Sequence, residues 1–183
     1  SKISEGEFLQ LTNENNIHIT ERKYIEIISL KTAELFAASM KIPAILTGKN
    51  LKIISSLNKL GLYFGIIFQI MDDYLDYFGD RVTGKKNGKD FYEGKITLPI
   101  ILLLKKSNKT EVNFIKKVFK KSKRLKNDYT EIINLMKKYK INDEVRIFCD
   151  KYNEKSLKIL KLFKGYQKDL FINLLINSIN RTH

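Results

Sequence analysis

Cysteine, proline and tryptophan are scarce in this chain of 183 residues, which contains one, two and none of them respectively. The single cysteine, Cys149, excludes an internal disulfide framework and fits a reducing compartment, either the cytoplasm or an organellar matrix rather than a secreted location. The low proline count and the scarcity of alternating polar and apolar residues favour an all-α fold. No uninterrupted apolar run reaches the roughly 18 to 20 residues of a membrane span.

Acidic residues are also few, with 20 Asp and Glu against 34 Lys and Arg, so the formal net charge is +14. Much of the excess lies between Lys105 and Lys126. Such a charge suits nucleic acid, a membrane surface or an anionic substrate. The aromatic interleaving of known nucleic-acid motifs is absent there, so no nucleic acid partner is expected. Two interpretations stay open: a solvated lysine-rich face, or a face that gives peripheral association with anionic membranes.

An apolar segment from about Leu51 to Phe78 predicts one long helix that carries three aspartates near its end. Residues three or four apart share a helix face, so Asp72 and Asp76 lie one above the other, with Asp73 at the margin. The stripe below them is expected to face the core, and the three carboxylates continue it. That stripe consists of Leu57, Gly61, Phe64, Gly65 and Phe68.

Carboxylates on such a stripe need a positive partner, because ionised groups removed from water must be paired or bound to metal. The negative end of the helix macrodipole adds to the cost. Mg²⁺ suits oxygen-only ligands, because it binds through one or two carboxylates together with waters and phosphate oxygens. The alternative is an Asp-rich helix end that is only solvated.

Thr20 is the expected N-cap of a second long helix, from Glu21 to about Lys41, which Pro43 should end or kink. Lys31 falls on the apolar face of this helix. An inward lysine is costly unless an anion meets it, so Lys31 is a candidate phosphate ligand; alternatively its stem packs while the ammonium reaches solvent. The apolar face comprises Tyr24, Ile27, Ile28, Leu35 and Ala38.

A Gly- and Lys-rich loop, VTGKKNGKD, follows the aspartates and leads into EGKITLP. Lysines on a flexible turn beside an Asp cluster suit a polyanion that is bridged by metal. Further helices are expected at about residues 96–104, 111–121, 129–139, 143–163 and 167–180. No internal repeat or linker interrupts them, so residues 1–183 are expected to belong to one domain.

The ordered combination of FQIMDDYLD, GK and G-x-D-x-x-x-GK-x-TLP resembles the second aspartate-rich region of the trans-isoprenyl diphosphate synthases. Lys31-Thr32 matches the Lys-Thr pair of that family, and the resemblance covers essentially the whole chain. It implies an isoprenoid-synthase-type helical bundle, of which this chain is the C-terminal portion, because the family's first aspartate-rich motif has no counterpart here.

The resemblance implies a prenyltransferase that joins an allylic diphosphate to isopentenyl diphosphate and releases pyrophosphate, with Mg²⁺ as cofactor and a homodimer or heterodimer as the assembly. The EGKITLP loop is closer to the long-chain polyprenyl branch than to the farnesyl branch. Because the chain carries only the second of the family's two aspartate-rich motifs, it should hold about half of a metal site. The chain alone is therefore not expected to catalyse the reaction. Two alternatives stay open: a non-catalytic or regulatory subunit of a heteromeric synthase, or a basic helical module for nucleic acid or lipid surfaces.

The resemblance also assigns roles to individual residues. The residues assigned to the metal are Asp72 as a direct ligand, with Asp73 and Asp76 ligating directly or through water. The residues assigned to the allylic diphosphate are Lys31, Lys85 and Lys95. Thr32 and Gln69 direct oxygen dipoles toward the developing cation, and with Lys31 and Lys85 they form the catalytic set. The remaining substrate contacts are Phe68, against the isopentenyl group, and Arg181, which helps to close the site.

Overall fold

The computed structural model describes residues 1–79 and 87–180, and no strand occurs among them. The predicted all-α fold is therefore confirmed. The elements are α1 (Lys2–Thr12), α2 (Glu21–Ile28), the π-helical turn η1 (Ser29–Ala33), α3 (Glu34–Leu46), α4 (Leu51–Phe78), α5 (Lys89–Glu93), α6 (Leu98–Lys106), α7 (Lys109–Phe119), α8 (Lys126–Lys138), α9 (Ile141–Leu160) and α10 (Tyr166–Ile179).

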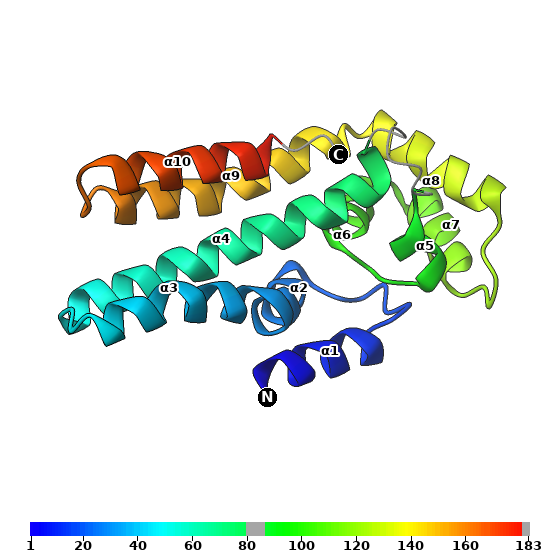
Figure 1. Ribbon diagram of the computed structural model, residues 1–183. Coiled ribbons are helices and arrows are strands. Elements are labelled where there is room, and N and C mark those ends of the chain that lie inside the picture. The colour runs from blue at the N-terminus through cyan, green and yellow to red at the C-terminus, as the bar shows by residue number, and fades with distance from the viewer. Residues whose placement is uncertain (80–86, 181–183) are drawn as a thin grey trace.

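The central element is α4, whose 28 residues make it about 42 Å long. The side-chain oxygen of Asn50 accepts the N–H of Ile53 at 3.0 Å and caps the first turn. Figure 1 shows α3 running back along one side of α4, and α9 and α10 along the other. Although charged residues interrupt its apolar run, α4 is the one described helix that is long and apolar enough to cross a membrane, a test of length and composition that core helices also pass. The predicted helix from Leu51 to Phe78 is confirmed at both ends.

Two glycines of α4 let it approach α3 and the end of η1 closely. A Cβ atom on Gly61 would lie 2.7 Å from the Cα of Ala37, and one on Gly65 would lie 2.5 Å from the Cα of Ala33. Both distances are shorter than any van der Waals contact, so only glycine fits. Beside them, the ring of Phe36 in α3 packs between two phenylalanines of α4, with centroid distances of 5.4 Å to Phe64 and 5.3 Å to Phe68.

Residues 21–46 form one helical run, with the π-helical turn η1 in its middle. Thr20 caps the run as predicted, since its hydroxyl accepts the N–H of Lys23 at 3.2 Å. The predicted end at about Lys41 is wrong, because α3 continues through Pro43 to Leu46. The alternative, a kink at Pro43, stays a prediction. A proline this close to the end of a helix removes one backbone hydrogen bond without preventing the last residues from staying helical.

The π-helical turn also changes which residues of this run face the core. Ala33 and Ala37 are buried, whereas Leu35, which was expected on the apolar face, is 61% exposed. A π-turn contains one more residue than an α-turn, so it rotates all later side chains relative to the 3.6-residue period. The expected face is therefore correct before the turn, at Tyr24, Ile27 and Ile28, and wrong after it at Leu35. Ala38, the last expected member, is half-buried.

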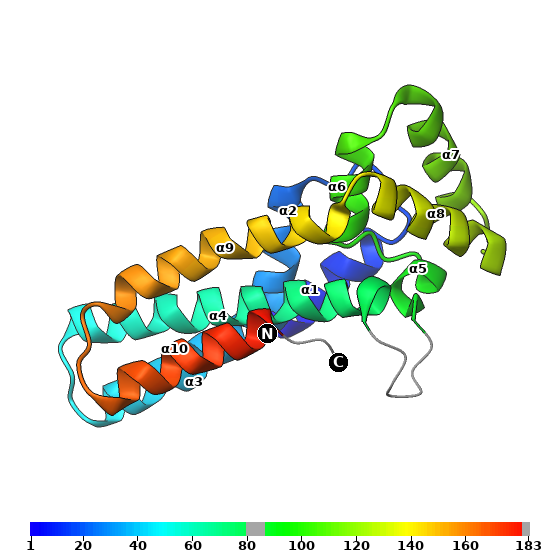
Figure 2. The same cartoon turned by 90° about the horizontal axis from the view of Figure 1, so that it is seen from above.

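The core continues into α6, where six consecutive residues from Leu98 to Leu103 are buried. Pro99 lies in the first turn of this helix, where its missing N–H costs little. The later helices all occur, each within a few residues of its expected bounds. In Figure 2, α5, α7 and α8 lie at the end of the molecule opposite the turn between α3 and α4.

Glu111 gives a pH-dependent link between α7 and α8. Its carboxylate accepts hydrogen bonds from Lys138 Nζ at 2.6 Å, from the Tyr139 hydroxyl at 2.5 Å and from the N–H of Asn108 at 3.0 Å. These donors lower the pKa of Glu111 to about 2. A lowered folded-state pKa contributes stability above the ordinary pKa of 4.5, and this contribution is lost as the pH falls toward 2.

We therefore expect Glu111→Gln to lower the urea midpoint of unfolding at pH 7, with a difference from wild type that shrinks as the pH falls below 4.5. Unfolding curves at a series of pH values measure this directly. Glu154→Gln, an exposed glutamate of α9, is the control and should give no pH-dependent difference. An E111Q deficit that stays constant down to pH 3 would contradict the lowered pKa.

Candidate active site

The three aspartates of α4 do not share one environment, although they lie within five residues. Asp73 is 5% exposed, Asp76 is half-buried, and Asp72 is exposed. The prediction that all three continue a buried stripe is therefore wrong for Asp72. The fully buried face of α4 includes Ile67, Ile70 and Tyr74, whereas Phe64 and Phe68 are only partly covered.

A chain of hydrogen bonds runs from the π-helical turn through α4 to α2. The Thr32 hydroxyl donates to Oε1 of Gln69 at 2.8 Å, and Nε2 of Gln69 donates to Oδ1 of Asp73 at 2.8 Å. The hydroxyl of Tyr24 then donates to Oδ2 of Asp73 at 2.6 Å. The same Gln69 nitrogen lies 3.4 Å from Oδ2 of Asp72. The structure thus brings together three predicted site residues from two distant segments of the chain: Thr32, Gln69 and Asp73.

Asp76 connects the end of α4 to the beginning of α5. Its two carboxylate oxygens accept the N–H groups of Lys89 at 2.9 Å and of Asp90 at 3.0 Å. Its own carbonyl oxygen accepts the N–H of Gly88 at 2.8 Å. A carboxylate at a helix N-terminus satisfies backbone donors that would otherwise lack partners. Asp76 therefore fixes the position of α5, and with it of Asp90, beside the end of α4.

The resulting acidic cluster has strongly raised pKa values. Burial, reinforced by the charge of Asp90, raises the pKa of Asp73 to about 8 against the opposing effect of its hydrogen bonds. Burial and Asp90 likewise raise the pKa of Asp76 to about 6. Burial also raises the pKa of Asp90, more than its ion pair with Lys95 lowers it. Several partly buried carboxylates that repel one another form a site at which a cation would be stabilising.

Lys31 lies in the π-helical turn and points toward α1. Its ammonium lies 2.9 Å from a carboxylate oxygen of Glu7 and donates a hydrogen bond to the Gln10 side-chain oxygen. α1 comes this close because Gly6 packs on the turn, where a Cβ atom would lie 2.8 Å from the Cα of Lys31. The side chain is 29% exposed. Lys31 is thus neither buried without a partner nor simply solvated, because two polar groups of α1 hold it.

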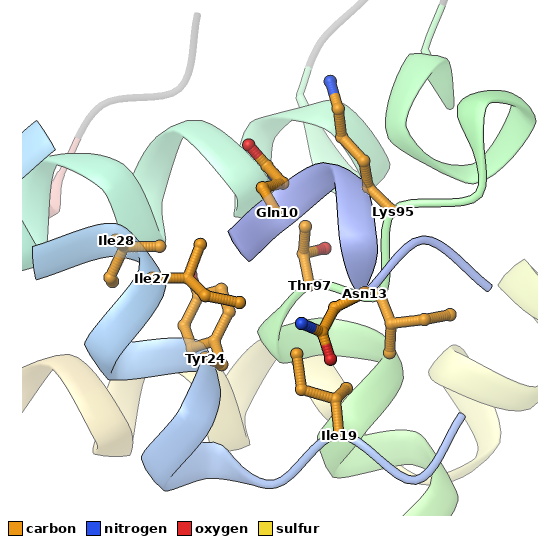
Figure 3. Close-up of a pocket in the computed structure, with 9 residues that line it drawn as sticks. Gln10, Asn13, Ile19, Tyr24, Ile27, Ile28, Lys95 and Thr97 are labelled. Atoms are coloured by element: carbon orange, nitrogen blue, oxygen red, sulfur yellow. The ribbon is translucent and has the colours of Figure 1, made fainter. Parts of the chain in front are cut away.

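Lys95 forms ion pairs with Glu93 at 2.6 Å and with Asp90 at 3.5 Å. Burial works against its charge, but these two carboxylates raise its pKa overall. Lys95 also lines a cavity of about 20 Å³ between α1, α2 and the segment before α6, and Figure 3 shows its ammonium pointing away from that cavity. A volume of this size holds about one water molecule. This cavity is therefore too small to be the binding site of a diphosphate.

Two predicted residues, Lys85 and Arg181, lie outside the described residues. Phe68 lies one turn before Asp72 on α4 and packs against Phe36 at 5.3 Å. Within residues 1–79 and 87–180, no three His, Cys, Asp or Glu side chains gather closely enough to hold a metal ion by themselves. The donors that are present, the carboxylates of Asp72, Asp76 and Asp90, are all oxygen ligands and fit a hard cation that completes its shell with water or phosphate.

Sequence reasoning missed four residues of this region. Tyr24 was placed on the apolar face, and periodicity gives no sign that its hydroxyl reaches Asp73. Gln10 and Glu7 belong to another helix, so their contact with Lys31 depends on tertiary packing. Asp90 did carry a signal, because it is the aspartate of the G-x-D pattern in the loop that follows the three aspartates.

Residues 1–136 match the family model described as "Polyprenyl synthetase". The chain belongs to this family. Among curated polyprenyl synthetase relatives, it is 45% identical to the octaprenyl diphosphate synthase of Escherichia coli over 100 residues, which cover 54% of this chain and 31% of the relative. It is 32% identical to the geranylgeranyl diphosphate synthase of Sulfolobus acidocaldarius over 156 residues, or 85% of this chain and 47% of the relative.

Solved structures of polyprenyl synthetases superpose over the whole chain. The decaprenyl diphosphate synthase from Rhodobacter capsulatus matches with a TM-score of 0.90 and 32% identity, covering 100% of this chain and 57% of that one. A polyprenyl synthase from Caulobacter crescentus, complexed with calcium and isoprenyl diphosphate, matches with a TM-score of 0.92 and 32% identity, covering 100% and 56%. This chain thus spans just over half the length of these proteins, and about a third to a half of the curated relatives.

Proposed function

We propose that this chain supplies the C-terminal portion of a prenyltransferase domain, whose reaction joins an allylic diphosphate to isopentenyl diphosphate. The observation that carries the proposal is the hydrogen-bonded chain from Thr32 through Gln69 to Asp73, beside the exposed carboxylate of Asp72. It brings the Lys-Thr segment and the aspartate-rich segment to one place. The known relatives, which are prenyl diphosphate synthases, support the same reaction class.

The cation at this site is proposed to be Mg²⁺, with Asp72 as its direct ligand and Asp76 and Asp73 ligating or bound through water. Asp72 is the most exposed of the three, and Asp76 and Asp90 add negative charge nearby. Too few carboxylates meet in the described residues to enclose an ion, and this suits Mg²⁺, which retains water and phosphate oxygens. When bound, the ion neutralises the diphosphate and stabilises its charge as it leaves.

The proposed roles of the other residues follow from their contacts. Lys31, held by Glu7 and Gln10, exchanges these partners for the oxygens of the allylic diphosphate, and Lys95 contacts the same group. The oxygens of Thr32 and Gln69 face the allylic cation that forms when the carbon–oxygen bond to the diphosphate breaks. The isopentenyl double bond attacks this cation, and pyrophosphate takes up the proton that is lost. Phe68, Lys85 and Arg181 keep the substrate contacts that the resemblance assigns to them.

The exposed apolar side chains support association with further helical segments. They lie on α1 (Phe8 and Leu11), on α3 (Leu35, Ile42, Ile45 and Leu46) and on α10 (Leu170, Leu174 and Ile176). Apolar side chains exposed in such numbers are typical of surfaces that are covered in an assembly. We propose a homodimer or heterodimer, and a long-chain polyprenyl product.

The substitution Asp72→Ala tests the site. We expect it to weaken Mg²⁺-dependent binding of geranyl diphosphate at least tenfold, about 1.4 kcal/mol, because a direct ligand of the bridging ion is removed. Isothermal titration calorimetry with Mg²⁺ and with EDTA measures this, while circular dichroism confirms that the variant stays helical. Asp150→Ala, an exposed aspartate of α9, is the matched control and should bind as wild type does. Unchanged binding by D72A would show that Asp72 holds no metal.

A further inference from the structure

The positive charge of this chain is concentrated at one end of the molecule. Residues 105–140, all of them described, contain thirteen Lys and Arg and three Asp and Glu, a net charge of +10 out of the total of +14. They form the end of α6 together with α7 and α8, opposite the turn between α3 and α4 (Figures 1 and 2). Most of the molecule is therefore close to neutral, and one end is strongly cationic.

The densest part of this end is the connection between α7 and α8. We call it the lysine turn, and its members are Lys117, Lys120, Lys121, Lys123, Leu125 and Lys126. All six side chains are exposed. Lys121 pairs with Asp128 at 2.6 Å, whereas the other four lysines form no ion pair with any described residue. These four lysines lie within ten residues, so their charges are separated by less than a Debye length and repel one another. Binding of an external anion would relieve this repulsion.

Two details of the local structure add to this cost. Lys126 occupies the first position of α8, at the positive end of the helix dipole, where a cation is unfavourable. Leu125, the N-cap residue, is 56% exposed between Lys123 and Lys126, and it makes no capping hydrogen bond with its side chain. The turn thus presents an apolar side chain surrounded by cations, which is the arrangement of segments that lie at a membrane interface.

The same residues do not suit nucleic acid. Arg124, the one arginine of residues 105–140, turns inward and donates to the carbonyl oxygens of Tyr92 and Phe119. It is 7% exposed, so it cannot contact phosphates or base edges in the manner typical of arginine. Of the large apolar and aromatic side chains in these residues, Leu125 is the one that is strongly exposed, so no aromatic platform for bases accompanies the charge.

We infer that the lysine turn docks this protein on an anionic lipid surface, with Leu125 inserted among the headgroups and the four unpaired lysines contacting lipid phosphates. The inference stands apart from the proposed function, because α7 and α8 contribute none of the site residues. A vesicle assay can therefore succeed or fail independently of diphosphate binding.

The test is flotation of the purified chain with vesicles of phosphatidylcholine, either alone or mixed in equal parts with phosphatidylglycerol. We expect binding to the mixed vesicles only, and steep weakening with added salt. Lys120→Glu, Lys123→Glu and Lys126→Glu together should weaken binding at least about tenfold. The matched control combines Lys49→Glu, Lys52→Glu and Lys59→Glu, three exposed lysines at the opposite end, and gives the same net charge. It should weaken binding less than about threefold.

A third variant isolates the apolar contact. Leu125→Ser places a favoured N-cap residue at the start of α8, so the fold should be retained, while binding to mixed vesicles should weaken severalfold. Equal losses in the two triple variants would overturn the inference, because they would indicate a response to total charge alone. Tighter binding to a DNA duplex than to mixed vesicles, abolished by the lysine-turn variant, would assign the surface to nucleic acid instead.

Discussion

Gly61→Ala should destabilise the protein by about 3 kcal/mol, although alanine is the better helix former. The added Cβ would lie 2.7 Å from the Cα of Ala37, and the backbone carbonyl of Phe36 is closer still. Backbone atoms of a packed helix cannot move aside singly, so α3 as a whole must shift away from α4. Because Phe36 packs against Phe64 and Phe68, this shift also loosens the aromatic contacts beside the site.

Urea unfolding followed by circular dichroism measures this effect. The matched control is Ser55→Ala, an exposed position of the same helix, which should gain a few tenths of a kcal/mol from helix propensity. If G61A is as stable as S55A, the backbones of α3 and α4 are not in contact at this point. The comparison separates the packing cost from the intrinsic preference of alanine for helices.

Asp73→Asn should stabilise the protein above pH 8 in the presence of EDTA. The folded-state pKa of about 8 lies well above the ordinary value of 3.8. The contribution of Asp73 to folding is therefore fully present below pH 3.8, and it is lost as the pH rises to about 8. Asparagine does not ionise, so the variant avoids this loss, which by linkage amounts to about 6 kcal/mol at most.

The hydrogen bonds of Asp73 can survive this substitution. The oxygen of asparagine can still accept from Tyr24, and its amide nitrogen can donate to Gln69 if the Gln69 amide rotates by half a turn. The rotated amide can then donate to the Thr32 hydroxyl.

Thermal unfolding of wild type and D73N between pH 4 and pH 9 should give curves that coincide at low pH and separate as the pH rises. A variant that is less stable than wild type at every pH would show that the carboxylate is ionised and stabilising in the folded protein. EDTA is needed because a bound cation would lower the pKa values of the cluster.

The helix that carries the aspartates was predictable, because a long apolar segment begins at about Leu51, after Asn50, and ends before Gly79. The two glycines that the sequence placed on its core-facing stripe, Gly61 and Gly65, are buried. The direction of α3 was not predictable, because the π-helical turn at Ser29–Ala33 leaves no trace in a period of 3.6 residues. The apolar face therefore failed at Leu35 although it was correct at Tyr24 and Ile27.

In the candidate site, too, the sequence predicted features that depend on one helix, but not those that depend on contacts between helices. Spacing placed Asp73 only at the margin of the aspartate cluster, and the resemblance added Gln69 and Thr32 as site residues. Which carboxylate is buried depends on a hydroxyl from another helix, because Tyr24 is the partner that holds Asp73. Adjacent residues on a helix point about 100° apart. The pattern placed Asp72 on the core-facing stripe and Asp73 at its margin, whereas in the structure Asp73 is buried and Asp72 is exposed. Their roles toward a metal remain predictions that the substitutions above can test.

The bonds from Asp76 to the backbone of Lys89 and Asp90 bear on how this region can change through evolution. Together with the bond from the side chain of Asn87 to the Gly79 carbonyl, they join the two ends of the seven-residue segment 80–86. Once the ends of a segment are held, doubling its length costs only about 0.6 kcal/mol in closure entropy. Changes in the length of this segment that leave the proposed substrate contact Lys85 in place should therefore cost little folding stability. Replacement of Asp76 would remove the two side-chain bonds that hold the start of α5, whereas the bond from Asn87 to the Gly79 carbonyl would remain.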